Sequence, residues 1–221
     1  MKLTFFYFLF FVFLVSCSTN NSDISDNNNV ALQVKMSSAD LLHKLLDSSE
    51  VLDTFEFNET YGYIKTGYLF KKNTKSAVLI YSKDSSDYYS IEVFVSNKNR
   101  WERKDRIDSL EIFPPQFSVE YVDCNFDNIK DILFQKSASN GISLSYRYLF
   151  TIDSVTNKMK QHPKFTNLSN TEIDIKNKTI KSITLIPCPY ADSYVICPLT
   201  SEWRNDTIVT LKATDCCKTL K

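Results

Sequence analysis

The run from Asp123 to Asp131 carries the clearest chemical signal in this chain. It reads Asp-Cys-Asn-Phe-Asp-Asn-Ile-Lys-Asp, so side chains bearing oxygen recur at its first, third, fifth and ninth positions. Calcium takes six to eight hard oxygen ligands at about 2.3 to 2.6 Å, and alternate residues of a tightly curled loop direct their side chains toward one point. We therefore predict a calcium site in residues 123–131. Its expected ligands are the side chains of Asp123, Asn125, Asp127 and Asp131 and the main-chain carbonyl of Ile129.

Two positions of this run depart from the EF-hand calcium loop. The sixth position normally carries glycine because it needs positive φ, and here it is Asn128, the residue that best tolerates that conformation after glycine. The twelfth is Phe134 in place of a bidentate glutamate. The chain is therefore not an EF-hand, and further ligands must come from Asp131, water or a distant residue. The alternative is a polar turn without metal, since this chain with only 3 Gly builds its turns from Asn, Asp and Ser.

A second signal lies at the N-terminus and ends at Cys17. Lys2 is followed by the almost wholly apolar residues 3–15 and then by Ser16 and Cys17. As a helix the apolar run would span only about 20 Å, against a hydrocarbon core of roughly 30 Å. We predict that residues 1–16 are a secretory signal peptide, because Ser16-Cys17 resembles a lipoprotein lipobox. Cys17 would then carry lipid such as palmitate; the alternative is a secreted protein in which this cysteine occurs by chance.

The rest of the chain divides into a tether and one domain. Residues 17–36 are polar and rich in Asn, which is typical of a flexible tether behind a lipid anchor. Residues 37–221 are expected to form a single domain that begins with a short amphipathic helix. Ser38 is the expected cap of this helix, because leucines recur at helical spacing after it.

From residue 61 onward the sequence is typical of β-strands. Short runs rich in Val, Ile, Tyr, Phe and Thr alternate with polar clusters that favour turns, as at residues 71–75 and 83–87. We therefore predict an all-β fold of antiparallel hairpins with one short N-terminal helix. In residues 88–95 the period-two pattern places Ser90 and Glu92 on a face toward water. The expected strands are 63–70, 77–81, 88–95, 117–122, 131–135, 144–152, 179–186 and 207–211.

Composition argues against several classes of function. Lys plus Arg and Asp plus Glu each number 26, so no net field would attract nucleic acid or anionic lipid. The two histidines, His43 and His162, belong to no recognisable triad or metal cluster. Gly-X-Ser-X-Gly, a phosphate loop and His-Glu-X-X-His do not occur. We therefore expect no enzyme, although a glycosidase with two distant carboxylates stays open as an alternative.

The remaining cysteines suggest an oxidising compartment. Besides Cys17 the chain has an odd number of cysteines, so at most two disulfides and one leftover thiol are expected within it. Cys188 and Cys197 flank a plausible hairpin and are the predicted disulfide pair. Metal binding is the alternative, although adjacent Cys216 and Cys217 lack the spacing of zinc knuckles.

Residues 117–135 also resemble a known family. The acidic run is similar to the Asp-X-Asn-X-Asp-Gly-X-X-Asp segment of bacterial lipoproteins related to calcium-binding periplasmic lysozyme inhibitors. In that family the segment joins strands of an antiparallel β domain and is followed by a loop containing Ser and Gly and then by an aromatic strand. Residues 137–143 and the aromatic run that follows them are similar. The likeness extends over residues 117–211 in layout and is specific only at the acidic run.

The resemblance implies a function in the cell envelope. The chain would be a lipid-anchored binding module, at the outer membrane on its periplasmic or surface face, that inhibits or protects against a lysozyme-like peptidoglycan hydrolase. Ser139, Asn140, Gly141 and Tyr146 would then form the partner-binding loop, although Ser-Asn-Gly also suits an ordinary hairpin turn. A structural or surface-assembly lipoprotein and a cell-wall glycan hydrolase are the alternatives.

Overall fold

The computed structural model describes residues 36–59, 62–82, 87–98, 100–112, 118–138, 144–188, 194–213 and 216–217. Residues 36–221 belong to one compact unit. Several predicted features fall outside the described residues: the signal peptide 1–16, Cys17, the tether as far as residue 35, and Ser139, Asn140 and Gly141. Within the described residues no helix is long and apolar enough to cross a membrane.

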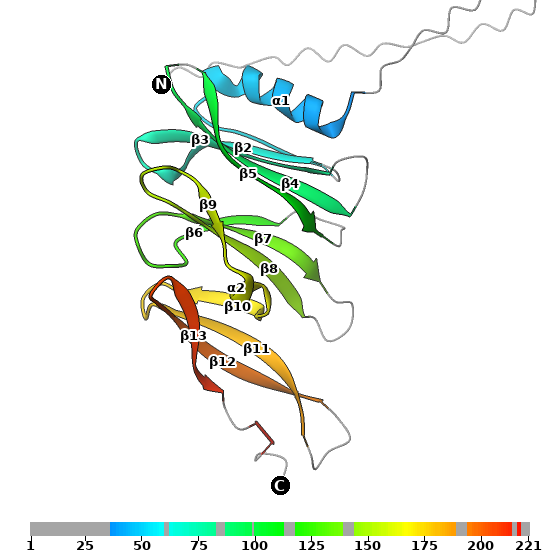
Figure 1. Ribbon diagram of the computed structural model, residues 1–221, viewed down its shortest axis with the longest axis vertical. Helices are drawn as coiled ribbons and strands as arrows, with labels where there is room; N and C mark the ends of the chain where they lie inside the picture. Colours follow the sequence, from blue (N-terminus) through cyan, green and yellow to red (C-terminus); the bar gives the residue numbers. More distant parts are fainter. Residues whose placement is uncertain are drawn as a thin grey trace, which may run out of the picture. The chain divides into compact units, whose positions relative to one another are not determined.

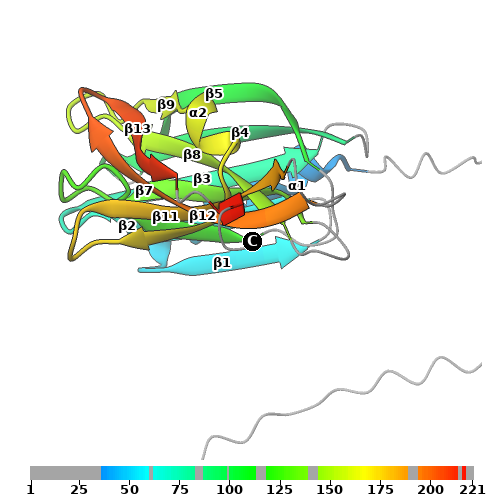
Figure 2. The same cartoon turned by 90° about the horizontal axis from the view of Figure 1, so that it is seen from below.

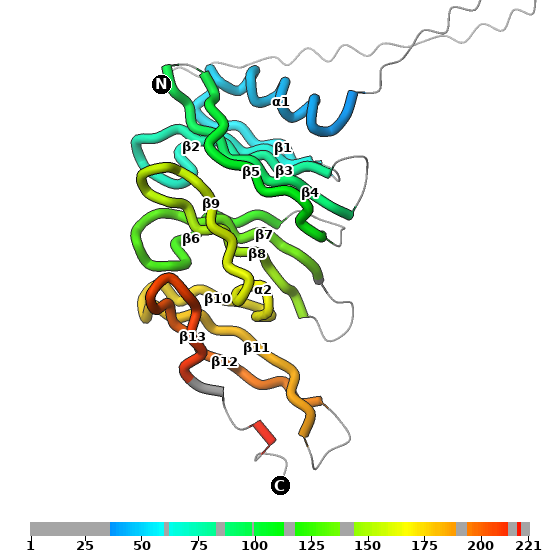
Figure 3. The backbone as a smooth tube through the Cα atoms, viewed as in Figure 1, coloured from blue at the N-terminus to red at the C-terminus, as the bar shows by residue number. Residues whose placement is uncertain are grey.

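Three consecutive antiparallel meanders make up most of the unit, and they lie one above another in Figures 1 and 3. Seen from below in Figure 2, the strands of the three meanders overlap. The prediction of an antiparallel all-β fold with a short N-terminal helix is confirmed. The first meander comprises β2 (Gly62–Lys71), β3 (Thr74–Ser82), β4 (Tyr88–Ser96) and β5 (Trp101–Glu111). The second comprises β6 (Val119–Val122), β7 (Asp131–Ala138), β8 (Ser145–Ile152) and β9 (Met159–Gln161). The third comprises β10 (Ser169–Asp174), β11 (Thr179–Pro187), β12 (Tyr194–Arg204) and β13 (Thr207–Ala213).

Shorter elements complete and join the meanders. Strand β1 (Phe55–Glu59) pairs with the first half of β2 and forms the edge of the first sheet. The short helix α2 (Pro163–Thr166) follows β9. The second and third meanders belong to one sheet, but β10 pairs with β8 only at Ser169 and Tyr146. This narrow junction lets the third meander bend away from the second.

Apolar side chains fill the spaces between the layers. Tyr89, Ile91 and Val93 of β4 face the second meander and pack with Phe134 and Phe150, as the period-two pattern predicted for this strand. A separate cluster that includes Leu133, Leu149, Phe165, Ile180 and Ile208 lies between the second and third meanders. Full burial of one large apolar side chain stabilises a fold by about 1.5 to 3 kcal/mol, so these clusters are the main source of stability.

Helix α1 (Ser38–Ser48) covers the other face of the first meander, and the 3₁₀ turn η1 (Ser49–Val51) follows it. Its cap is Ser37, one residue before the predicted cap, because the Ser37 hydroxyl accepts the N–H of Asp40 at 3.2 Å. The prediction that Ser90 and Glu92 face water is wrong. The side chain of Glu92 is 0 % exposed because α1 and the long strand β5 cover the face on which it lies.

The disulfides differ from the predicted pairing. Cys188 bonds to Cys217 and Cys197 to Cys216, with Cα atoms 5.5 and 5.7 Å apart. The predicted Cys188–Cys197 bond is wrong because of strand register: Cys197 lies opposite Thr184 on β11, while Cys188 follows the end of that strand. The two adjacent C-terminal cysteines therefore reach one partner each.

Candidate functional site

The acidic run forms the connection between β6 and β7. The ladder of these strands pairs Val122 with Asp131, so the first and last residues of the run lie together at the base of the loop. The backbone curls tightly in between, with positive φ at Phe126 (63°) and Asn128 (68°). Positive φ at Asn128 was expected from its position in the run, whereas that at Phe126 was not. The loop thus has the curled form that the sequence predicted.

The side chains of the loop fold inward onto its main chain. The Asp123 carboxylate accepts the N–H groups of Asp127 at 3.1 Å and of Asn128 at 2.8 Å. Asp127 in turn accepts the N–H of Ile129 at 2.8 Å. The Asn125 amide donates to Asp127 Oδ2 at 2.9 Å, and its oxygen accepts the Asp127 N–H at 3.2 Å. Three of the predicted ligand side chains therefore converge within the loop.

This donor set fits calcium in its chemistry. All three converging side chains present oxygen, the ligand type that calcium prefers. A carboxylate offers about four lone-pair sites, so the hydrogen bonds to Asp123 and Asp127 leave acceptor capacity. Asp127 is exposed and Asp123 and Asn125 are half-exposed, so an ion can reach them. Among the described residues no group of three or more His, Cys, Asp and Glu is placed to hold a metal ion. A site here would therefore depend on the Asn125 amide and on main-chain carbonyls such as that of Ile129.

Asp131 occupies a different environment from the other predicted ligands. Its side chain is 0 % exposed, Oδ2 accepts the Cys124 N–H at 2.9 Å, and Oδ1 accepts the Ile152 N–H at 3.2 Å. Burial raises the pKa of Asp131 to about 7, although both N–H groups act to lower it. The carboxyl group therefore joins the start of the loop to the end of β8. Its role as a calcium ligand stays a prediction.

Two residues, one in the loop and one just after it, belong to the core. Phe134, at the twelfth position of the run, is fully buried between the first and second meanders and offers no ligand. Cys124 is buried and is the one described cysteine without a disulfide, in keeping with the odd count. Burial raises the pKa of the Cys124 thiol, which keeps it protonated and unreactive.

The predicted partner-binding loop lies at the far end of β7. This strand begins at the acidic loop and ends at Ala138, and β8 begins at Ser145, so residues 139–143 connect the two strands. Tyr146 is half-exposed and pairs with both Ser137 of β7 and Ser169 of β10. It therefore stands where the second meander meets the third.

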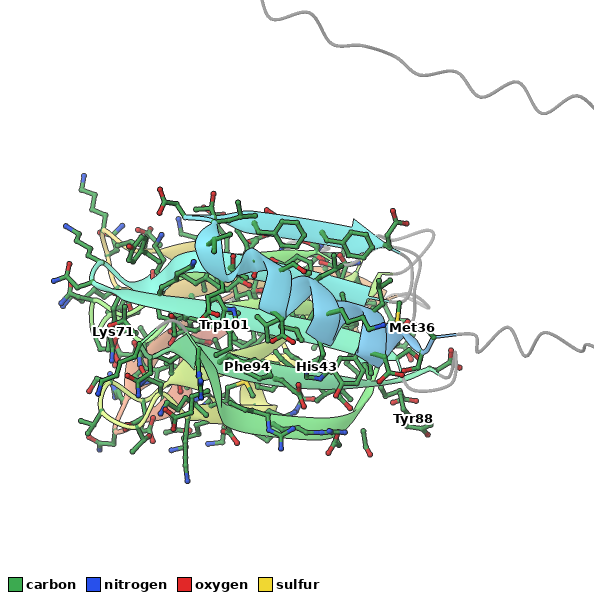
Figure 4. The ribbon with its side chains drawn as sticks, turned by 90° about the horizontal axis from the view of Figure 1, so that it is seen from above. Met36, His43, Lys71, Tyr88, Phe94 and Trp101 are labelled. Atoms are coloured by element: carbon green, nitrogen blue, oxygen red, sulfur yellow. A yellow bond between two sulfur atoms is a disulfide. The ribbon has the colours of Figure 1, made fainter. Side chains whose placement is uncertain are left out.

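The structure also brings together a charged cluster that the sequence did not reveal. Glu92 lies 3.0 Å from Arg103 Nη1, 3.3 Å from Arg106 Nη1 and 3.3 Å from His43 Nε2. His43 projects from α1 toward Phe94, as Figure 4 shows, with ring centroids 5.9 Å apart. In the sequence Glu92 only alternates with core residues, which gave no signal of burial. These contacts attach α1 to the first meander.

His162 is likewise part of the packing. Its side chain is buried, with Nε2 2.8 Å from the Thr151 hydroxyl and its ring 4.8 Å from that of Trp203. Burial lowers the pKa of His162, so the imidazole is held neutral.

Fold and site together define an antiparallel all-β protein of three stacked meanders, with an acidic loop closed by its own side chains between β6 and β7. No protein-family model, no curated protein and no solved structure matches the chain. The function must therefore be inferred from the geometry of this loop and of the strands that leave it.

Proposed function

We propose that this chain is a lipid-anchored, extracytoplasmic binding protein that inhibits, or protects against, a lysozyme-like peptidoglycan hydrolase. In this proposal calcium stabilises the acidic loop, and residues 139–143 contact the hydrolase. The observation that carries the proposal is the position of the loop. It lies at the start of β7, the strand that leads directly into the proposed contact segment.

The two disulfides support the proposed compartment. Cys188–Cys217 and Cys197–Cys216 both lie in the C-terminal part of the chain. Disulfides persist in oxidising environments such as the bacterial envelope and are rare in the cytosol. They agree with export by the signal peptide and with a lipid on Cys17.

The acidic loop supplies a physical role for the ion. Asp123, Asn125 and Asp127 would hold calcium, whose charge would offset that of the two carboxylates gathered in the loop. Asp131 joins the loop to the end of β8. Both strands that flank residues 139–143 in the sequence are thus joined at the loop.

The chemistry of residues 139–143 and of Tyr146 suits a sugar-binding cleft. Small side chains at Ser139 and Gly141 let main-chain amides and carbonyls approach a cleft closely. Tyr146, half-exposed at the start of β8, would pack at the rim of the cleft.

The test is inhibition of purified lysozymes of several classes by the full chain. A variant that combines Ser139→Tyr, Asn140→Phe and Gly141→Val should lose inhibition while keeping its melting temperature. The matched control is Lys176→Tyr, a bulky change in the exposed turn between β10 and β11. Failure to inhibit any lysozyme would overturn the inhibitor proposal and favour a surface-assembly lipoprotein. Digestion of peptidoglycan by the chain itself would favour the hydrolase alternative.

A further inference from the structure

An open groove of about 650 Å³ lies between β2 and β6. Its volume falls within the range of about 300 to 1,000 Å³ that is usual for ligand pockets. Most of its lining comes from these two strands, which belong to different sheets. The lining residues are Thr54, residues 65–69, residues 119–122 and Lys130.

The strands border the groove with their main-chain edges. Residues 65–69 of β2 and 119–122 of β6 line it without a gap in sequence. Successive side chains of a strand point to opposite faces, so an unbroken run along a wall indicates that the edge of the strand faces the cavity. The groove is therefore bounded by the edge of β6 and, beyond Thr66 where the pairing with β1 stops, by the edge of β2.

Hydrogen-bonding groups of β6 point into this groove. Among the described residues β6 is the last strand of its sheet, paired on one side with β7. The N–H of Gln135 donates to the Ser118 carbonyl at 3.0 Å, and residues opposite each other in an antiparallel ladder alternate between bonded and non-bonded pairs. Val119 and Tyr121 are therefore the non-bonded positions of β6. Their N–H and C=O groups face outward, toward the groove.

The edge of β2 on its β1 side is open only beyond Thr66. Strand β1 pairs with β2 only as far as Thr66, opposite Phe55. The next residue, Gly67, has a positive φ of 142°, and a Cβ there would lie 3.1 Å from the Thr54 side chain. Thr54, the residue before β1, therefore packs close to Gly67 at this wall of the groove.

Charge in the groove favours an acidic ligand. Lys65 and Lys130 both line it, and the Lys65 ammonium lies 5.7 Å from the centre of the Tyr121 ring. Glu56 lies 2.7 Å from the same ammonium and offsets its charge, so Lys130 is the lining cation for which the described residues show no ion pair. The one acidic lining residue, Glu120, is 3.1 Å from Arg147 on β8, which offsets its charge.

We propose that this groove binds an extended peptide segment of a partner protein as an added strand on β6, with an acidic side chain of the peptide directed to Lys130. Strand addition to an open sheet edge takes affinity from main-chain hydrogen bonds and specificity from side chains at alternate positions. At about 3.3 Å per residue, β6 offers an edge of about 13 Å, enough for both Val119 and Tyr121 to bond the incoming strand.

The test begins with a displayed library of random eight-residue peptides, screened on the full chain. The proposal expects enrichment of β-prone sequences with at least one acidic residue. For a selected peptide, hydrogen exchange of the Val119 and Tyr121 amides should slow on binding. Val119→Pro removes one outward N–H and no N–H of the β6–β7 ladder, so it should weaken binding roughly tenfold. Should this variant fail to fold, the same peptide N-methylated at alternate residues gives the equivalent test. Methylation of the alternate peptide N–H groups that face β6 should abolish binding. Methylation of the alternate N–H groups that point away from β6 should not.

Charge reversal supplies the matched comparison. The variant Lys130→Glu should weaken binding of an acidic peptide at least tenfold, whereas Lys176→Glu on the β10–β11 turn should leave it unchanged. Three outcomes would overturn the proposal. They are the absence of enriched peptides, unchanged exchange at Val119 and Tyr121 in the bound state, and competition by peptidoglycan fragments, which would mark a glycan groove instead.

Discussion

Replacing Asp131 by asparagine tests whether a buried carboxyl group holds the base of the acidic loop. Both oxygens of this side chain accept main-chain N–H groups, from Cys124 at 2.9 Å and from Ile152 at 3.2 Å. The Asp131→Asn variant keeps the shape, but its amide nitrogen must point at one of these N–H groups. One buried donor then loses its acceptor.

The expected cost depends on pH in a direction that follows from burial. One unsatisfied buried donor costs about 1 to 3 kcal/mol, which should apply at pH 5, where the Asp131 carboxyl is protonated in the folded state. The pKa of Asp131 in the folded state, about 7, lies above its ordinary value of 3.8. The stability that the Asp131 carboxyl contributes is therefore full below pH 3.8 and is lost as pH rises through 7. Between pH 5 and pH 8 the free energy of unfolding of the wild type should fall by about 3 kcal/mol more than that of the variant. The cost of substitution should therefore fall to about zero, or reverse, at pH 8.

The measurement is urea unfolding of both proteins at pH 5 and pH 8, with a chelator present to exclude calcium. At pH 5 the free energy of unfolding of the variant should be lower by about 1 to 3 kcal/mol, seen as a lower urea midpoint. Asp153→Asn is the control, since Asp153 also accepts two main-chain N–H groups, from Val155 and Thr156, but is exposed and has a lowered pKa. Its cost should not change between pH 5 and pH 8. A cost of Asp131→Asn that stays constant or grows with pH would contradict a raised pKa of Asp131 in the folded state.

Three further predictions concern the anchor, the ion and a buried histidine. Cys17→Ala should release the protein from membranes, and retention through a carbonate wash would contradict lipidation. Calcium at a hundredfold excess over Kd should stabilise the wild type by about 2.7 kcal/mol in thermal melts. The same calcium concentration should not stabilise Asp127→Ala. It should stabilise the control Asp153→Ala by as much as the wild type. Because burial lowers the pKa of His162, its contribution is present above about pH 6.5 and is lost as pH falls below that value. The His162→Gln variant should therefore lose less unfolding free energy than the wild type as the pH falls below about 6.5. An equal loss in both proteins would show that another group causes it.

Strand recognition from the sequence succeeded where apolar residues alternate and failed where strands are exposed. Strand β4 was predicted almost to its ends because its alternate residues fill the core. Strand β5, with its run Glu-Arg-Lys-Asp-Arg, was not predicted, because as the edge of its sheet it exposes most of its charged side chains. Strand β12 carries Pro198 and also went unpredicted, although both its neighbours in the sheet pair with it. Main-chain hydrogen bonds to neighbouring strands hold such strands, and the pattern of residue types does not reveal these bonds.

The cysteines show the same limit. Their odd number correctly required a leftover thiol, which the structure assigns to Cys124. The pairing was wrong because proximity in sequence is a poor measure of distance across a sheet. The register of β11 and β12 places Cys197 opposite Thr184 and so separates it from Cys188.

Features that depend only on neighbouring residues could be predicted from the sequence. The spacing of Asp123, Asn125 and Asp127 led to an inward-folded loop, and Asn128 adopts the positive φ expected of it. Turn conformation and side-chain hydrogen bonds over a few residues are local, so the order of residue types is enough to predict them.

Features that join distant segments could be recognised only in the folded chain. Glu92 was expected in water, but α1 and β5 bury it. Asp131 is held by the N–H of Ile152, and the groove between β2 and β6 exists only because two sheets meet there. Each of these depends on which faces and edges pack together, and packing between segments far apart in the chain is set by the whole core and not by any local pattern.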